Sequence, residues 1–162
     1  MVVGVDNGLD GGLCALSKFN GDVISYIKMP TLKRKGKSEI DPKPIKQWLL
    51  DFNTPFVLVI EEPLRHAPSS QSMRSMSISF GKLLGMADAA GFDVECVEVR
   101  DWQTDMLGRL PKGKTKPAAL ALAKKLEPDQ NWLANKRCKT PHDGIIDAYL
   151  IAKYYLKHEN NH

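Results

Sequence analysis

The sequence lacks the features that mark membrane, secreted or zinc-binding proteins. No apolar stretch reaches the ~20 residues that a membrane-spanning helix needs. The N-terminus has no basic segment followed by a long apolar region, so no secretion signal is expected. Cysteine occurs only three times, without Cys-x-x-Cys or Cys/His spacing, at Cys14, Cys96 and Cys138. This pattern supports neither a zinc site nor a disulfide framework, and we expect reduced thiols in a cytosolic protein, with Cys14 and Cys96 in the core.

Length and composition indicate one globular domain. The chain has 162 residues, of which 43% are hydrophobic and 26% charged, which is enough to form a real core. No internal repeat or low-complexity block divides it. We expect a single domain over residues 1–156 and a polar, frayed tail over residues 157–162. The net charge of +4, from 23 basic and 19 acidic residues, says little about a partner until the charges are placed in space.

Apolar runs and helical spacing alternate along the chain. The apolar runs predict strands over residues 2–6, 13–19, 23–29, 56–60 and 94–99. Helical spacing predicts helices over residues 41–52, 73–90, 100–107, 115–126 and 142–156. Asp41 before Pro42 is typical of a helix start, and Gly91 is typical of a helix end.

Polar segments separate these elements and are expected to be loops, over residues 30–39, 63–72 and 131–140. The order of elements is a hairpin meander followed by alternating helices and strands. This order predicts an α/β fold with a mixed five-stranded sheet and helices on both faces.

Four carboxylates occupy positions that such a fold could bring together. Asp6 ends the first apolar run, and Glu61 directly follows the run over residues 56–60. The helix over residues 41–52 can act as a right-handed crossover, which would make these two strands parallel neighbours. Both acids then lie at the carboxyl edge of the sheet, where open α/β sheets place their sites. Asp143 and Asp147 are four residues apart and share one helix face.

Convergence of these acids predicts a divalent metal site. Two like charges ~4 Å apart repel by about 4 kcal/mol at the effective dielectric of a near-surface site, so the cluster needs a counter-charge. Carboxylate oxygens suit Mg²⁺ or Mn²⁺ better than zinc. Two such ions could activate a water and clamp a phosphodiester.

Simpler interpretations of the same acids remain open. A single Asp at a strand end is often a turn or capping residue, and Asp143 could be a helix-start acid favoured by the helix dipole. Asp147 is harder to explain in this way, because it interrupts the apolar run over residues 145–152. Glu61 and Glu62 point to opposite faces of a strand, and spacing does not decide between them.

The ordered set of motifs resembles the RuvC-type Holliday-junction resolvases, most of all their short phage and bacterial branch within the ribonuclease H-like superfamily. The motifs run from Val2 to about Tyr154: Val-Gly-Val-Asp6-Asn-Gly-Leu-Asp-Gly-Gly, Val-Ile-Glu61, Phe80-Gly-Lys-Leu-Leu-Gly85, Trp102, Gly113-Lys-Thr-Lys116 and His142-Asp-Gly-Ile-Ile-Asp-Ala148. The resemblance implies a ribonuclease H-like fold and a dimeric, Mg²⁺-dependent endonuclease that nicks two opposed strands of a four-way DNA junction.

The resemblance also implies a set of site residues. It selects Glu61 over Glu62 and gives four catalytic metal ligands, Asp6, Glu61, Asp143 and Asp147. Lys114 and Lys116 match positions that neutralise charge near the scissile phosphate, and we assign Lys114 to the catalytic set. The chain departs from the family pattern in two places: Asn7 replaces a frequent proline, and the last two acids are four residues apart where three is common. His142 is either an assistant to phosphate or metal, or a helix-start residue.

Basic residues gather in three predicted loops or helix starts. The clusters comprise Lys33, Arg34, Lys35 and Lys37; Lys112, Lys114 and Lys116; and Lys136, Arg137 and Lys139. Each could be a solvated loop, but their shared placement favours a split phosphate-binding rim. Arg74, in the polar stretch over residues 68–75, is a further candidate for DNA contact, although a mobile loop would look the same.

We expect the protein to form a homodimer, since a two-fold dimer presents two sites to opposed strands of a junction. The helix over residues 73–90 is the expected interface, with Gly81 and Gly85 allowing close approach. Two other functions remain: a nuclease for flaps, forks or RNA/DNA hybrids, and a non-catalytic nucleic-acid-binding module. The intact set of four acids argues against the second. The expected setting is the cytoplasm of a bacterial or phage-infected cell, without a membrane partner.

Overall fold

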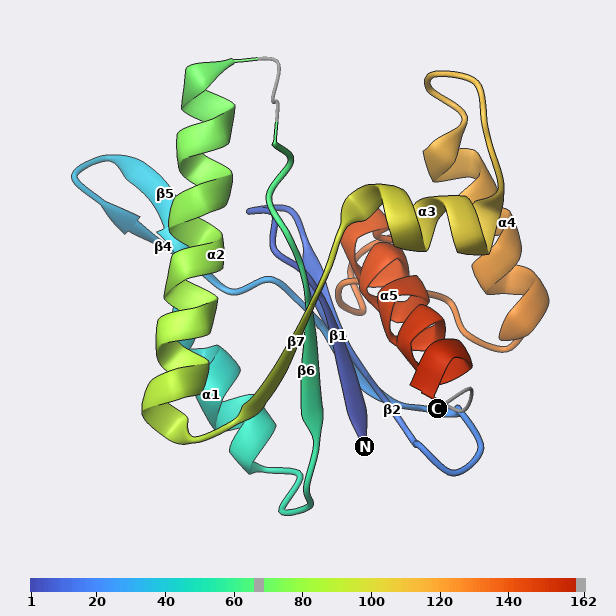
Figure 1. Ribbon diagram of the computed structural model, residues 1–162, viewed down its shortest axis with the longest axis horizontal. Coiled ribbons are helices and arrows are strands. Elements are labelled where there is room, and N and C mark those ends of the chain that lie inside the picture. Colours follow the sequence, from blue (N-terminus) through green and yellow to red (C-terminus); the bar gives the residue numbers. More distant parts are fainter. Residues whose placement is uncertain (66–68, 160–162) are drawn as a thin grey trace.

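A twisted five-stranded sheet forms the centre of the protein (Figure 1), as seen in a computed structural model that describes residues 1–65 and 69–159. The strands lie in the order β3-β2-β1-β6-β7. Their bounds are β1 Val2–Asp6, β2 Gly12–Leu16, β3 Val23–Lys28, β6 Val57–Glu61 and β7 Asp93–Val97. β1, β2 and β3 are antiparallel, whereas β6 is parallel to β1 and β7 is parallel to β6. The predicted mixed five-stranded sheet is confirmed.

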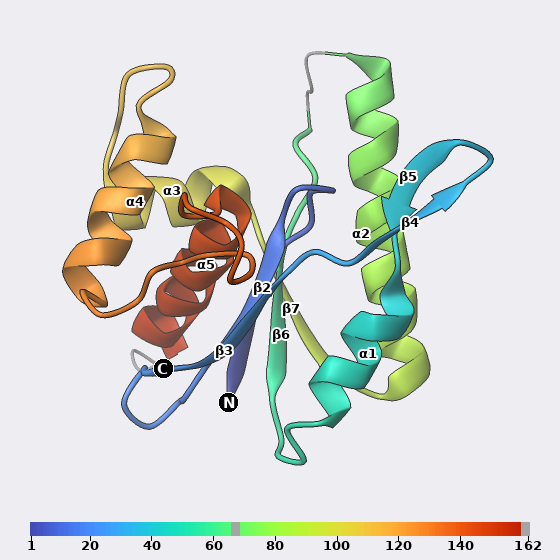
Figure 2. The same ribbon diagram turned by 180° about the vertical axis from the view of Figure 1, so that it is seen from behind.

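Helices cover both faces of this sheet (Figures 1 and 2). One face carries α1 Pro42–Leu50 and α2 Ser70–Ala90, and the other carries α3 Val99–Leu107, α4 Thr115–Leu126 and α5 Asp143–Glu159. Because alternate side chains of a strand point to opposite faces, β1 contributes to two cores. Val3 and Val5 pack with the residues of α1 and α2, and Val2 packs with those of α5.

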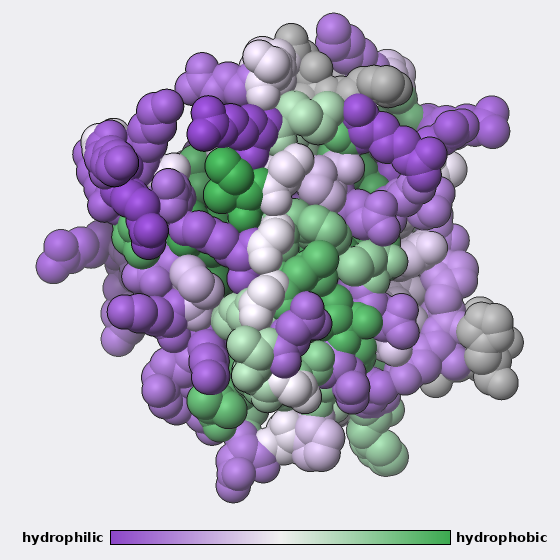
Figure 3. Space-filling model, turned by 60° about the vertical axis from the view of Figure 1, so that its left-hand side comes forward, coloured by the Kyte–Doolittle hydropathy of each residue, from purple (hydrophilic) through white to green (hydrophobic). Residues whose placement is uncertain are grey.

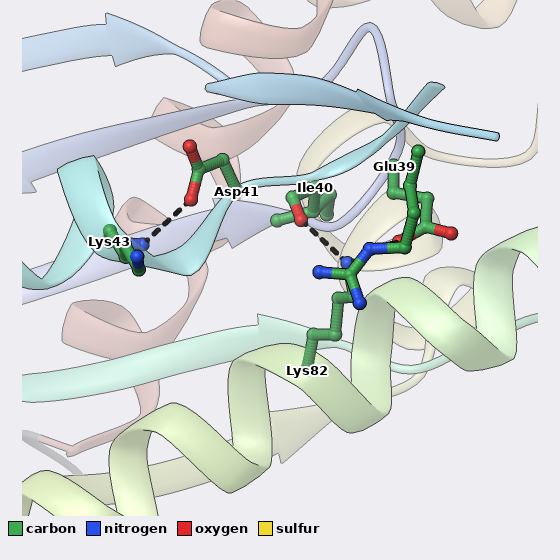
Figure 4. Close-up of polar contacts among 6 residues, drawn as sticks. Glu39, Ile40, Asp41, Lys43 and Lys82 are labelled. Carbon is green, nitrogen blue, oxygen red and sulfur yellow. Dashed lines mark hydrogen bonds and ion pairs between the residues drawn. The ribbon is translucent and has the colours of Figure 1, made fainter. Parts of the chain in front are cut away.

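Local sequence signals account for several element boundaries. Asp41 is the N-cap of α1, and its carboxylate accepts a hydrogen bond from the backbone N–H of Lys43 at 3.1 Å (Figure 4). Gly91 ends α2 in the left-handed conformation, with φ of 68°. These two predictions are confirmed, and α4 has the predicted bounds.

The loop predicted over residues 30–39 is wrong, because this segment forms a β-hairpin. Its strands are β4 Thr31–Arg34 and β5 Lys37–Ile40, which pair in a separate two-stranded sheet. Lys35 and Gly36 make the two-residue turn with φ of 49° and 77°. A turn with two positive φ angles matches the twist of the two strands that it joins. The basic and polar composition of this segment resembles that of a loop, so it did not indicate a hairpin.

Three further differences concern boundaries and burial. α5 continues to Glu159, so residues 157–159 are helical and not part of a frayed tail; the Lys157 ammonium lies 2.9 Å from Asp105. α2 begins at Ser70, three residues before its predicted start, and Ser69 caps it by accepting from the Ser72 N–H. Cys96 is exposed, because β7 lies at the edge of the sheet.

Residues 66–68 of the loop predicted over 63–72, and residues 160–162 of the predicted tail, lie outside the described residues. No helix within the described ranges is both long and apolar enough to cross a membrane.

Candidate active site

Asp6 stands at the carboxyl end of β1, where the chain enters a tight turn. The turn closes with a hydrogen bond from the Gly11 N–H to the Gly8 carbonyl at 2.9 Å. The Gly8 N–H also donates to Asp6 Oδ1 at 3.0 Å, which fixes the direction of the carboxylate. The four residues before Asp6 are buried, so the strand holds its backbone in place.

Glu61 reaches the same edge of the sheet from β6. The parallel register pairs Val5 with Ile60, so Asp6 and Glu61 follow at neighbouring strand ends. Two residues hold Glu61 from either side: the Asn7 side-chain N–H donates to its backbone carbonyl at 2.5 Å, and the Trp102 indole N–H donates to its Oε1 at 2.8 Å.

α5 brings the remaining two acids to this edge by packing very closely on β1 and on the turn that follows it. A Cβ on Gly4 would lie 2.0 Å from the Ala148 carbonyl oxygen, and a Cβ on Gly144 would lie 2.4 Å from the Asp10 carbonyl oxygen. Gly11 and Gly144 also form a parallel β-bridge. No residue with a side chain fits at either glycine without moving the helix, so the packing fixes the position of Asp147, next to Ala148.

Burial, and for Glu61 and Asp147 also the charge of neighbouring carboxylates, raises the pKa values of three acids at this edge. Burial and then the Asp6 charge raise the pKa of Glu61 to about 8. Burial, followed by the charges of Asp6 and Asp143, raises the pKa of Asp147 to about 7. Burial also raises the pKa of Asp6, while the Gly8 N–H and Lys116 oppose that rise. Mutual repulsion of this kind requires that the carboxylates lie close together.

Lys116 is the cation of this cluster. Its ammonium lies 2.8 Å from Asp143 Oδ2, and it lowers the pKa values of Asp6 and Asp147. Asp143, half exposed, raises the pKa of Lys116 in return. Lys114, assigned to catalysis from the sequence, is exposed at the N-cap of α4 and is not among the groups that shift these carboxylates.

His142 occupies the start of α5. Its Nδ1 accepts a hydrogen bond from the Ile145 N–H at 3.3 Å, and its carbonyl accepts from the Ile145 and Ile146 N–H groups at 3.2 Å. Burial lowers its pKa, so the neutral ring can act as acceptor. These contacts agree with the helix-start interpretation of His142.

The predicted DNA-binding residues lie on several separate elements. Lys33, Arg34 and Lys37 belong to the β4–β5 hairpin and Lys35 to its turn, while Arg74 is in the first half of α2. Lys112 precedes α4, and Lys136 and Arg137 lie in the irregular segment between α4 and α5. The hairpin and α2 stand on one side of the β1 end, and the segment before α4 stands on the other (Figures 1 and 2).

Two residues of the site were not found from the sequence: Asn7 was considered only as a departure from a proline, and Trp102 only as core packing. Both are almost fully buried polar side chains, at 1% and 0% exposure. Buried amide and indole N–H groups need acceptors, and this requirement is the signal that could have pointed to Glu61.

The chemistry of the donors fits a hard divalent cation. Asp6, Glu61 and Asp147 supply carboxylate oxygens, which Mg²⁺ and Mn²⁺ prefer, and burial, the largest cause in each case, raises the pKa values of all three, so a bound cation would favour their ionised forms. As the side chains stand, no three Asp, Glu, His or Cys residues within the described ranges have the spacing of a bound metal. A cation would therefore have to draw the carboxylates inward.

The fold as a whole can be compared with solved structures. RuvC of Thermus thermophilus in complex with a Holliday junction substrate is 14% identical in sequence, with a TM-score of 0.60 over 97% of this chain and 94% of that chain. A second structure of Thermus thermophilus RuvC is 13% identical, with a TM-score of 0.56 over 98% of this chain and 96% of that chain. The chain has a RuvC-type fold.

The RuvC-type fold spans nearly the whole chain and confirms the predicted ribonuclease H-like α/β architecture. No protein-family model and no curated protein sequence matches the chain. At such low identity the likeness concerns the fold, so the function has to be argued from the side chains of the site.

Proposed function

We propose that this protein is a metal-dependent endonuclease that cuts branched DNA, with the four-way junction as its main substrate. The observation that carries the proposal is the cluster of Asp6, Glu61 and Asp147 at the carboxyl edge of a RuvC-type sheet: burial raises the pKa values of all three, and the Asp6 charge raises those of Glu61 and Asp147 further. Perturbed acids at the carboxyl edge of an open sheet are a signature of functional sites. The RuvC of known structure that carries a junction substrate supports the choice of DNA.

Asp6, Glu61 and Asp147 would hold Mg²⁺, or Mn²⁺ in its place, with Asp143 as the fourth ligand. Two bound ions would supply the positive charge that activates a water and stabilises the leaving oxygen of a phosphodiester. The chain's own residues prepare this site: the Gly8 N–H orients Asp6, and Trp102 orients Glu61. Lys116, which pairs with Asp143, would contact a phosphate oxygen beside the carboxylates.

Contacts to phosphates would supply most of the affinity, since they dominate protein–DNA binding. We assign these contacts to the basic residues predicted from the sequence: Lys33, Arg34, Lys35, Lys37, Arg74, Lys112, Lys114, Lys116, Lys136 and Arg137. Lys114 remains in the proposed catalytic set, with the role of a second cation at the scissile phosphate. Lys116 is the first cation there. The protein would act in the cytoplasm.

A homodimer would let two sites cut opposed strands of a two-fold symmetric junction. The outer face of α2 supports this part of the proposal, because a Cβ on Gly81 or Gly85 would meet no atom within 4 Å. Figure 3 shows a band of weakly polar and apolar residues down the middle of this side of the molecule, with hydrophilic residues around it.

The decisive experiment measures cleavage of synthetic four-way junction, fork, flap, linear duplex and RNA/DNA hybrid substrates, each with Mg²⁺, with Mn²⁺ and with a chelator. We expect paired nicks in the junction that require a divalent ion. Asp147→Asn should abolish cleavage while junction binding persists, because the phosphate contacts remain. Cutting of linear hybrid with the junction left intact would replace this proposal by the ribonuclease H alternative, and cleavage by Asp147→Asn would remove Asp147 from the site.

A further inference from the structure

A hollow of about 600 Å³ opens between the β4–β5 hairpin and the first half of α2. Its lining combines two cations with groups that donate hydrogen bonds: Lys37, Arg74, Ser70, Gln71, Ser75 and Ser79. Hydroxyl, amide, ammonium and guanidinium groups together are the set that proteins use to bind the sugar–phosphate backbone.

Glu39, the acidic residue that lines the hollow, does not repel an anionic ligand, because two cations neutralise its charge. Glu39 Oε2 lies 2.7 Å from Lys82 Nζ and 3.6 Å from Arg34 Nε. The Lys82 hydrogen bond holds the pKa of Glu39 below its usual range. Lys82 also donates to the Ile40 carbonyl at 3.0 Å, so one side chain of α2 fastens β5 to the helix.

The two cations that line the hollow remain available to a ligand. Neither Lys37 nor Arg74 forms an ion pair in the part of the chain that the structure describes, residues 1–65 and 69–159. Because the hairpin is fixed to α2 through Lys82, these cations occupy a defined surface, which reduces the entropy lost when a ligand binds.

The hollow lies next to the candidate active site, and the turn after β1 is common to both. Leu9, which also lines it, lies in the turn whose Gly8 N–H binds Asp6. The start of α4 and the segment before it lie on the opposite side of the same edge (Figures 1 and 2). The first turn of α4 carries Lys116, which pairs with Asp143. The carboxylates therefore lie between two basic surfaces, which we call the two walls. One wall is the hollow with Lys37 and Arg74, and the other is the start of α4 with Lys116.

We propose that the hollow between the hairpin and α2 binds the backbone of a second nucleic-acid arm, distinct from the arm cut beside Lys116. This inference rests on the proposed function and deepens it, since it gives a physical reason for preferring branched DNA. A branched molecule can place phosphates on both walls at once. A linear duplex that passes the carboxylates contacts one wall, so it forms fewer phosphate contacts.

The test compares variants with the same change of charge inside and outside the hollow. Lys37→Ala combined with Arg74→Ala removes both cations from the hollow, and Lys43→Ala combined with Lys46→Ala removes two exposed cations from α1. Affinity for a four-way junction and for a linear duplex is measured in the Asp147→Asn background at several salt concentrations. We expect the hollow variant to lose about tenfold or more in junction affinity, with a salt slope shallower by up to about 2 and a smaller loss on duplex.

A second pair of variants adds one negative charge inside or outside the hollow. Ser75→Glu places a carboxylate in the hollow, whereas Thr54→Glu places one in the exposed loop before β6, away from the hollow and from the proposed dimer face of α2. We expect Ser75→Glu to weaken junction binding and Thr54→Glu to leave it near that of the parent. Circular dichroism checks that each variant is folded.

Equal junction affinities and salt slopes for the hollow and control variants would overturn the inference, as would equal losses on junction and duplex. The outcome is separate from that of the proposed function, which is decided by metal-dependent cleavage with the unsubstituted protein. A protein that cuts junctions but shows no difference between the variant pairs keeps the proposed function and loses the second-arm site.

Discussion

The indole N–H of Trp102 donates a hydrogen bond to Glu61 Oε1 across 2.8 Å. Trp102 is fully buried on α3, and Glu61 ends the neighbouring strand β6. Burial and the Asp6 charge raise the pKa of Glu61 to about 8, and this hydrogen bond opposes them. It also holds one carboxylate oxygen and so directs the other. Partners of this kind orient metal-binding side chains in many proteins.

Trp102→Phe should weaken Mg²⁺-dependent cleavage by about 10- to 100-fold, the usual cost of losing a partner behind a metal ligand. The phenyl ring keeps most of the packing, so the fold should persist. The matched control is Trp132→Phe: Trp132 is equally buried, but its Nε1 has no hydrogen-bond partner within the described residues. Cleavage rates as a function of Mg²⁺ concentration would show the difference, and equal rates in the two variants would exclude a positioning role for Trp102.

Gly4→Ala should separate Asp147 from Asp6. Its Cβ would lie 2.0 Å from the Ala148 carbonyl oxygen, so α5 has to move away from β1. Overpacking of this kind costs roughly 1–3 kcal/mol of unfolding free energy. Lys46→Ala is the control, because Lys46 is exposed on α1 and its replacement should change the unfolding free energy by less than about 0.5 kcal/mol. Urea unfolding measures both, and unchanged stability and cleavage in Gly4→Ala would contradict the close packing.

Lys116→Ala should reduce cleavage more than Lys114→Ala. The Lys116 ammonium contacts Asp143 and acts on the pKa values of Asp6 and Asp147, whereas Lys114 is exposed at the start of α4. The ion pair with Asp143 is largely exposed, so neither variant should lose more than about 1 kcal/mol of stability. Single-turnover cleavage at saturating protein isolates the chemical step. A larger loss with Lys114→Ala would restore the assignment made from the sequence.

The metal-free protein should become less stable as the pH rises towards about 8. The folded pKa of Glu61 is about 8 and that of Asp147 about 7, above their ordinary values of 4.5 and 3.8. Between the ordinary and the raised pKa values, the folded state therefore binds more protons than the unfolded state. The contribution of these two acids to the free energy of unfolding is fully present at acid pH, and it is lost as the pH rises through about 7 and 8. A bound cation favours the ionised carboxylates, so stabilisation by Mg²⁺ should grow with pH.

Thermal unfolding at several pH values, with Mg²⁺ and with a chelator, measures this dependence. Asp147→Asn is the control, since the amide carries no titratable proton and should reduce both trends to the part that Glu61 contributes. Stabilisation by Mg²⁺ that is independent of pH would show that these carboxylates do not hold the ion.

Local patterns in the sequence determined most of the elements. The apolar runs over residues 2–6 and 56–60 form buried strands, Asp41 and Pro42 start α1, and Gly91 ends α2 where expected. These signals are local, because capping and alternation depend on neighbours in the chain. The hairpin over residues 31–40 was missed, because its turn depends on two positive φ angles at Lys35 and Gly36 and its composition is that of a loop.

The sequence alone supplied the four acids and the edge of the sheet where two of them meet, since parallel strands have their carboxyl ends on one side. Only the tertiary structure decided which groups hold them: Asn7 and Trp102 on Glu61, Lys116 on Asp143, and α5 against Gly4. These contacts join residues far apart in the chain, and the same residue types would serve equally well elsewhere. Their partners follow from how the helices dock on the sheet, which no local pattern encodes.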